Sequence, residues 1–271
     1  LVNIQGDNQT TVDFPLENTP SLSLTAKYKG STELLEGTTS TNNQGGERPS
    51  SSRDGRLIAY EKTVNGIQQI YYRDLVTGGV PVLVSQNYLP FNNGGGNGSS
   101  HKPKVSSDGS AIVFHSSASD IVPGDFNKHN DVFLYRVDSQ ELVRAYNFTT
   151  GNESNGPSYN PDVNDDGSVV VFESEATNLL SNKETTSGRQ ILVWNTKLGD
   201  NSTISAVTSG NGESKTPSID GTGKVLVFAS DATDIPFIVG KNVYQENNTT
   251  DSNYSNEYTD VFLHYLETNQ T

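Results

Sequence analysis

The 271-residue chain contains no cysteine and no methionine. Without cysteine there can be no disulfide framework, no thiolate metal site and no cysteine nucleophile. Methionine is missing even at position 1, where the chain begins Leu-Val-Asn-Ile, and this predicts a processed product or an excised segment. Apolar residues make up only 32% of the chain. No run approaches the roughly 18 apolar residues of a membrane span, so we expect no membrane insertion.

Cationic residues are also scarce: 18 Lys and Arg stand against 32 Asp and Glu, a net charge of −14. Nucleic acids and anionic membranes bind basic surfaces, so neither is an expected partner. The low apolar content does not indicate disorder, because the apolar residues are concentrated in short β-branched and aromatic runs that strands can bury.

One sequence motif occurs four times in this chain. Each copy has a proline, a glycine six residues later and an aromatic residue eleven residues later. The prolines recur every 54 to 58 residues, which indicates that one supersecondary unit is reused. The prolines and their aromatic partners are Pro49 with Tyr60, Pro103 with Phe114, Pro161 with Phe172, and Pro217 with Phe228.

The second copy shows what one unit builds. Residues 102–105 form a short extended piece, and Asp108-Gly109 is a dipeptide that supplies positive φ for a tight hairpin turn. Residues 111–116 are a nearly continuous apolar run, as expected for a strand covered on both faces. Residues 131–138 and 140–148 provide two further strands. Each copy therefore predicts four antiparallel strands.

The predicted fold class is all-β: a β-propeller of four-stranded antiparallel blades, since sequential sheets of this kind arrange radially and protect their edges. Stacked sandwiches are the alternative. The pattern Pro-x4-Asp-Gly-x4-Phe, followed by "SSASDIVPGDFNKHNDVFLYRVD", resembles the TolB-type, WD40-like (PD40) propeller repeat of secreted and surface proteins. The resemblance implies the fold well and the function poorly, because propellers are scaffolds. It covers repeats at residues 46–97, 98–155, 156–210 and 211–271.

We interpret residues 1–271 as a single propeller, but the sequence does not determine how its ring closes. The fourth repeat stops at its third strand. Residues 1–45 either form a degenerate fifth blade or provide one strand that completes the last blade. We favour the first interpretation, which gives about five blades. A four-bladed ring and a fragment of a longer propeller are alternatives.

The repeated aspartates Asp54, Asp108 and Asp166 are interpreted as turn residues rather than catalytic carboxylates, because each precedes glycine in a hairpin. The repeated aromatic residues are interpreted as packing between blades.

The loop "DIVPGDFNKHND" is the strongest candidate for a ligand-binding site. Asp125, Asn127 and Asp131 are oxygen ligands at alternate spacing, which suggests a Ca²⁺ site and makes calcium the one cofactor that the sequence indicates. It is not an EF-hand, because the glycine at position six is absent and Arg136 stands where a bidentate glutamate would end the loop. Alternatively, Asp131 hydrogen-bonds the blade backbone, since Asp260, Gln69 and Gln190 occupy the same place in the other repeats.

Asn-X-Ser/Thr sequons indicate an extracellular, glycosylated protein, and they lie mostly in Gly/Asn-rich stretches where a glycan would be tolerated. A long insertion at residues 235–260 carries tyrosines suited to a carbohydrate or protein contact. The sequons begin at Asn8, Asn97, Asn147, Asn152, Asn201, Asn247, Asn248, Asn253 and Asn269.

The sequence shows no nucleophile elbow, no HExxH and no P-loop, so we expect no enzyme and name no catalytic residue. The favoured function is a non-enzymatic extracellular module, structural or adhesive, in a cell-surface or self-assembling structure. In one version, the segment "QTTVDFPL" of a neighbouring chain adds a strand to the last blade. The alternatives are a secreted hydrolase or lyase acting on polysaccharide, and a TolB-like protein-binding module.

Overall fold

The computed structural model describes residues 46–89, 94–180, 188–196, 203–208, 211–233, 235 and 259–266, together with the backbone of three N-terminal strands. All regular elements in these ranges are β-strands. None of the described residues forms a helix that could cross a membrane. The chain divides into two compact units, Leu1–Gly37 and Thr38–Thr271.

The N-terminal unit is a three-stranded antiparallel sheet made of β1 (Val2–Gln5), β2 (Gln9–Phe14) and β3 (Leu22–Lys27). The segment predicted to add to a neighbouring chain is β2, and it is the central strand of this sheet. Residues Gln9–Phe14 of this segment pair with β1 on one side and β3 on the other within the chain, and strand addition to a neighbouring chain stays a prediction. The role of residues 1–45 as a fifth blade stays a prediction.

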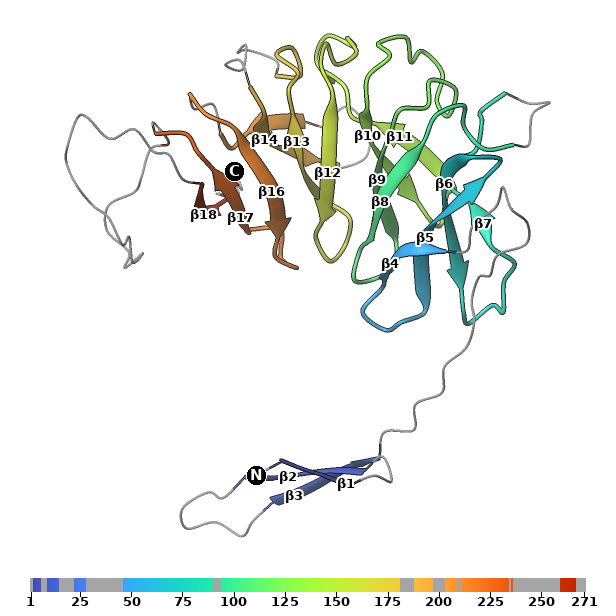
Figure 1. The fold of residues 1–271 in the computed structure, drawn as a ribbon, viewed down its shortest axis with the longest axis vertical. Coiled ribbons are helices and arrows are strands. Elements are labelled where there is room, and N and C mark those ends of the chain that lie inside the picture. Colours follow the sequence, from blue (N-terminus) through green and yellow to red (C-terminus); the bar gives the residue numbers. More distant parts are fainter. Residues whose placement is uncertain are drawn as a thin grey trace. The chain divides into compact units, whose positions relative to one another are not determined.

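The second unit contains four antiparallel sheets that follow one another along the chain and fan out in chain order (Figure 1). Sheet 1 is β4 (Glu47–Ser51), β5 (Leu57–Val64), β6 (Ile67–Asp74) and β7 (Val82–Leu83). Sheet 2 is β8 (Ser100–Val105), β9 (Ala111–Ser116), β10 (Asp131–Arg136) and β11 (Glu141–Arg144). Sheet 3 is β12 (Ser158–Val163), β13 (Val169–Ser174), β14 (Gln190–Asn195) and β15 (Thr203–Ala206). Sheet 4 is β16 (Ser214–Ile219), β17 (Val225–Ser230) and β18 (Asp260–Tyr265).

Each sheet is a meander in which consecutive strands pair, so each predicted repeat is one sheet. The first three sheets have the predicted four strands, and the fourth has three strands within the described residues. Each sheet packs face to face on the next one. This is the blade arrangement of a β-propeller, and the predicted fold class is confirmed.

Residues alternate between the two faces of a sheet along each strand, and in these sheets both faces carry apolar residues. We call the face that contacts the next sheet in the chain the forward face, and the opposite one the back face. In sheet 2, Phe114 and Phe133 of the back face stack with ring centroids 5.4 Å apart and pack against sheet 1. Val113 and Leu134 of the forward face pack against sheet 3. Phe172 and Phe228 likewise lie in the second and third inter-sheet clusters, so the predicted packing role is confirmed for the three phenylalanines, whereas Tyr60 lies in none of the clusters.

A bulge interrupts the first strand of every sheet directly before its proline. Proline has no N–H to give to the ladder, and a bulge accommodates this loss. The residue before the proline has a positive φ, an uncommon conformation for a residue other than glycine. These residues are Arg48, Lys102, Asn160 and Thr216, with φ of 45°, 54°, 48° and 53°.

Buried glutamates of the preceding sheet hold two of these bulges. The backbone N–H of Lys102 donates to Glu61 Oε1 of sheet 1 at 2.7 Å. The backbone N–H of Thr216 donates to Glu173 Oε1 of sheet 3 at 2.7 Å. Both glutamate side chains are fully buried. A carboxylate of one sheet thus fixes the backbone conformation of the next sheet.

The hairpin turns confirm the structural reading of the repeated aspartates. Asp54, Asp108 and Asp166 each accept a hydrogen bond from the backbone N–H two residues later, and the glycines between have φ near +70°. In sheet 4 the roles of the two turn positions are exchanged. Asp220 stands where sheet 2 has Ser106, and it accepts from the hydroxyl of Thr222, which stands where sheet 2 has Asp108. The hydrogen bond survives with donor and acceptor reversed.

Glu173 supports a test of the inter-sheet carboxylate. We expect Glu173→Ala to lower the free energy of unfolding by about 3 kcal/mol, because it leaves the Thr216 N–H and Arg189 without a buried partner. Glu175 pairs with the same arginine but has a 40% exposed side chain, so Glu175→Ala should cost less than about 1 kcal/mol. Urea denaturation measures both. Equal losses in the two variants would show that the bulge contact contributes nothing.

Candidate functional site

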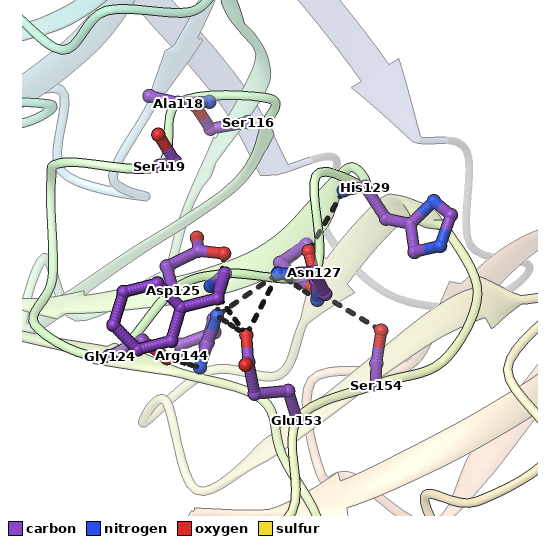
Figure 2. Close-up of polar contacts among 12 residues, drawn as sticks. Ser116, Ala118, Ser119, Gly124, Asp125, Asn127, His129, Arg144, Glu153 and Ser154 are labelled. Carbon is purple, nitrogen blue, oxygen red and sulfur yellow. Dashed lines mark hydrogen bonds and ion pairs between the residues drawn. The ribbon is translucent and has the colours of Figure 1, made fainter.

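The loop singled out by the sequence folds around a buried arginine (Figure 2). Asp125 and Asn127 lie in the connection between β9 and β10, and Asp131 is the first residue of β10. Arg144 is the last residue of β11, and Glu153 lies in the connection that leads on to β12. Three segments of the second repeat therefore converge, and the structure brings together all three predicted calcium ligands.

Arg144 makes the central contacts of this cluster. Its Nη1 lies 2.8 Å from Asp125 Oδ1, 3.1 Å from Glu153 Oε2 and 3.4 Å from Asp131 Oδ2. Its Nη2 donates to the Gly124 carbonyl at 3.0 Å. Because the guanidinium has five N–H donors in a fixed plane, it can bind several oxygens from different segments at once.

Asp131 is the most buried member of the cluster, with 1% of its surface exposed. Its Oδ2 also accepts from the Asn127 side-chain amide at 2.9 Å, and its Oδ1 lies 3.1 Å from the Ser154 hydroxyl. The same hydroxyl donates to the Gly156 carbonyl at 2.6 Å. In sheet 1, Gln69 at the equivalent position donates directly to the Gly96 carbonyl. The predicted backbone contact is thus direct for Gln69 and passes through Ser154 for Asp131.

The cluster holds more acid than base, since three carboxyl groups share one guanidinium. Burial raises the pKa of Asp131 to about 6, even though Asn127 and Arg144 favour its charged form. Burial also raises the pKa of Asp125 above its ordinary value, in spite of Arg144. The pKa of Glu153 is lowered instead: burial opposes this, but hydrogen bonds from the Phe126 N–H and from Arg144 outweigh it. Below about pH 6 a proton on Asp131 thus offsets part of the excess negative charge.

The calcium prediction finds no support in this geometry. Among the residues that the structure describes, no group of three or more His, Asp and Glu side chains is arranged to hold a metal ion. The cation at the centre of the three carboxyl groups is that of Arg144. Calcium at Asp125, Asn127 and Asp131 therefore stays a prediction, and the experiment below tests it.

The cluster also fixes one exposed aromatic residue. Phe126 is 78% exposed, and its backbone N–H donates to Glu153 Oε2 at 2.8 Å. The adjacent Asn127 N–H donates to the same oxygen at 3.1 Å. An aromatic ring on a loop that is held at its backbone is a preorganised contact residue, because binding then orders little additional chain.

Three sequons lie in the described part of the chain. Asn97 and Asn152 are exposed. Asn147 is 4% exposed, and its side-chain amide donates to the carbonyls of Asn178 and Leu180 at 2.8 and 3.3 Å. The structure therefore argues against a glycan on Asn147, whose amide nitrogen is consumed inside the protein. The remaining predicted sites lie outside the described residues: Asn8, Asn201, Asn247, Asn248, Asn253 and Asn269.

Polar residues at equivalent positions of three repeats connect two loops by hydrogen bonds. Asn155 and Thr177 exchange two hydrogen bonds between loops, and Asn211 with Thr233 and Asn97 with Ser119 do the same in the other repeats. The glycine after each asparagine is needed for this approach. A Cβ on Gly98 would lie 2.6 Å from the backbone of Ser117.

A second polar feature lies between the first strands of sheets 1 and 2. A cleft of about 290 Å³ is lined by three cationic and three neutral residues: Arg48, Pro49, Ser50, Lys102, Pro103 and Lys104. The gathering of three cations is notable on a chain with a net charge of −14. Such a surface attracts acidic groups.

Comparison with known proteins gives structural likeness only. No family model matches the chain, and no curated protein matches it. Membership of the PD40 family therefore stays a prediction.

Among solved structures, TolB from Acinetobacter baumannii is 15% identical with a TM-score of 0.42, and the match covers 84% of this chain and 49% of that one. Putative TolB from Agrobacterium tumefaciens is 20% identical with a TM-score of 0.45, covering 85% and 66%. The tricorn protease is 12% identical with a TM-score of 0.45, covering 86% and 23%. The chain thus spans about half the length of the first TolB structure. No argument about activity or partner follows from likeness at this level.

Replacing the central arginine tests what the cluster does. We expect Arg144→Met to lower the free energy of unfolding by about 3 to 5 kcal/mol, because buried carboxylates lose their counter-charge. Arg53→Met is the matched control: Arg53 is 72% exposed in its pair with Asp165, so its loss should cost less than about 1 kcal/mol. Thermal melts with calcium and with chelator complete the test. Because Arg144 supplies the cation, we expect neither to shift the wild-type melting temperature, and a rise with calcium that Asp125→Ala abolishes would establish the metal site.

The raised pKa of Asp131 makes stability depend on pH. The folded state binds this proton more tightly than the unfolded chain, whose Asp pKa is near 3.8, so the stability that Asp131 contributes falls as pH rises from about 4 to about 6 and changes no further above that. The loss is about 3 kcal/mol. Asp131→Asn should remove this slope, as measured by denaturant unfolding from pH 4 to pH 7. Parallel profiles for the variant and the wild type would mean that Asp131 does not titrate in this range.

Proposed function

We propose that the chain is a non-enzymatic, extracellular β-propeller module that serves a structural or adhesive role through protein contacts. The observation that carries the proposal concerns the buried ionisable groups. In the described part of the chain, each buried Asp, Glu and Arg residue has a partner in another segment of the propeller; these residues are Glu61, Asp125, Asp131, Arg144 and Glu173. The buried acids of the described residues are thus engaged in holding sheets and loops together, which supports a structural role for them.

The distribution of these acids supports the same conclusion. A general acid must reach its substrate within hydrogen-bond distance. Asp131 has the raised pKa that a general acid requires, but only 1% of its surface is exposed and Asn127 and Arg144 cover it. Glu61 is bound by Arg48, by the Lys102 N–H and by His101. Both acids suit a structural role better than a catalytic one.

The extracellular location is supported by the exposed sequon residue Asn152 and by the acidic composition of the chain. Contact with other macromolecules is supported by Phe126, whose exposed ring stands on a fixed loop. Aromatic residues are enriched among the residues that carry binding energy at protein interfaces. The proposal therefore assigns the loops to contact and the buried charges to stability.

Binding of an acidic carbohydrate is a second candidate function, and the cationic cleft favours it. Arg48, Lys102 and Lys104 face one space large enough for a sugar-sized group. The binding would be electrostatic and sensitive to salt. This candidate requires no catalysis and differs from the first in its ligand.

One pair of assays tests both candidates. Purified chain is incubated with neutral and uronate-containing polysaccharides, and reducing ends and unsaturated products are measured; we expect none above the buffer control. Turnover would overturn the non-enzymatic role. A glycan array then tests the second candidate: salt-sensitive binding of acidic glycans that is lost in Lys104→Glu and kept in Lys215→Glu would establish carbohydrate binding, and we expect no such binding from a module built for protein contacts.

A further inference from the structure

The interface between sheets 2 and 3 is built differently from the interfaces on either side of it. In those two interfaces a buried glutamate of the earlier sheet, Glu61 or Glu173, accepts from the bulge N–H of the later sheet. At the same position of the repeat, sheet 2 has His115, which is 7% exposed and stands edge-on to Tyr159 of sheet 3. Its Nδ1 is buried and has no hydrogen-bond partner among the described residues. A titratable ring thus replaces the carboxylate at this interface.

Two further buried donors of this interface also have no hydrogen-bond partner in the described part of the chain, Arg136 Nε and Trp194 Nε1. Arg136 belongs to sheet 2 and reaches the Thr196 carbonyl of sheet 3 with its Nη2. Trp194 belongs to sheet 3 and lies in the apolar cluster that the two sheets share. A buried polar atom without a partner has lost its hydration and gained no bond in exchange, which weakens the contact. The interface therefore depends on apolar burial.

The charged groups that sheets 1 and 2 place near His115 disfavour a proton on it. His101 lies directly across on β8 with the ring centroids 5.7 Å apart, and Lys102 follows it along the strand. The acid on this side is Glu61 of β5, which is already bound by Arg48 of β4 and by the Lys102 N–H. Its Oε2 also lies 3.2 Å from His101 Nδ1. Little of this negative charge is left for His115.

The groups on the other elements around the ring are engaged as well. On β12, the Tyr159 ring has the guanidinium carbon of Arg189 at 5.3 Å from its centroid. The acid there is Glu173 of β13, and Arg189 binds it at 3.1 Å. On β10 the residue paired with His115 is Val132, which carries no charge. A proton on His115 would therefore add a buried cation beside other cations, with no carboxylate free to pair with it.

The result is a ring that resists protonation. Burial lowers the pKa of His115 to about 3 from the ordinary value of 6.5, and His101 and Lys102 add to this effect. The folded state binds this proton less tightly than the unfolded chain does. The stability that His115 contributes is therefore full above about pH 6.5 and is lost as pH falls toward 3. Asp131, whose pKa is raised, acts in the opposite sense.

We propose that the contact between sheets 2 and 3 is an acid-sensitive joint, which is closed while the His115 ring is neutral and loosens when the ring takes a proton. Sheets 1 and 2 share one apolar cluster and the Glu61 contact, and sheets 3 and 4 share another cluster and the Glu173 contact. Each pair of sheets thus keeps its own interface when the joint loosens. The inference goes beyond the proposed function, since it assigns a response to acid and not a partner.

NMR of the imidazole groups and urea denaturation test the inference. We expect the His115 ring to stay neutral in the folded protein well below pH 6.5. From about pH 6.5 to about pH 4.5, we expect the equilibrium constant for unfolding of the wild type to rise about fiftyfold relative to that of His115→Phe, because only the wild type takes up this proton on unfolding. Asp131 is present in both proteins, so its opposite effect cancels in the comparison.

Two more variants complete this measurement. His115→Gln is a second neutral replacement, and it keeps the test valid if phenylalanine does not fit the site. His129→Gln is the matched control, since His129 lies in the connection between β9 and β10. It should show the pH dependence of the wild type.

Trp194 locates the change, because it is the single tryptophan of the chain and is 1% exposed in the cluster between sheets 2 and 3. As the wild type is acidified, we expect acrylamide to quench its fluorescence more strongly before far-UV circular dichroism reports a loss of strands. In His115→Phe the quenching should stay low over the same range.

A His115 ring that titrates near pH 6.5 in the folded protein would overturn the inference. So would a pH dependence that both His115 variants retain. A Trp194 signal that changes only together with the strand signal would also overturn it, since acid would then unfold the sheets as one unit.

Discussion

Face-to-face packing of each sheet on the next is the constraint on which the rest of this structure depends. A strand that is apolar on both sides can be stable only between two other layers, and β9 and β10 of sheet 2 are buried along almost their whole length. Sheet 2 therefore needs sheets 1 and 3, and the interfaces reuse the same positions each time. Loops, turns and bulges place each sheet in the same position relative to the sheet before it.

Polar groups add direction to this apolar packing. Hydrophobic burial is not directional, whereas a buried hydrogen bond fixes distance and angle. Glu61 and Glu173 each bind the N–H of a strained residue in the following sheet, so they specify which strand packs where. His115 occupies the same position in sheet 2 and stands edge-on to Tyr159 of sheet 3 instead. Burial lowers its pKa to about 3, so the ring is neutral there and packs as an aromatic group.

Much of the fold was predictable because its determinants are local. Period, turn dipeptides and apolar runs lie within a few residues of one another, and they predicted four repeated sheets and the turn role of Asp54, Asp108 and Asp166. The site was less predictable. Asp125, Asn127 and Asp131 do meet, but Arg144 and Glu153 come from later segments, and nothing in their local sequence marks them as partners. An acidic loop alone cannot reveal whether its counter-ion is a metal or an arginine. The bulges were missed for a similar reason, since a residue before proline ordinarily avoids positive φ, and for Lys102 and Thr216 the stabilising acceptor is a glutamate of another sheet.

The contact between Glu61 and the Lys102 N–H has an order in time as well as in space. In both such contacts the carboxylate belongs to the earlier sheet and the N–H to the later one. Synthesis runs from the N-terminus, and early segments tend to fold first. When the first strand of a new sheet leaves the ribosome, the acceptor that will fix its bulge is therefore already in place. Sheets 1 and 3 thus present the acceptor before sheets 2 and 4 present the donor, so at these two interfaces the order of synthesis matches the order in which the contact can form.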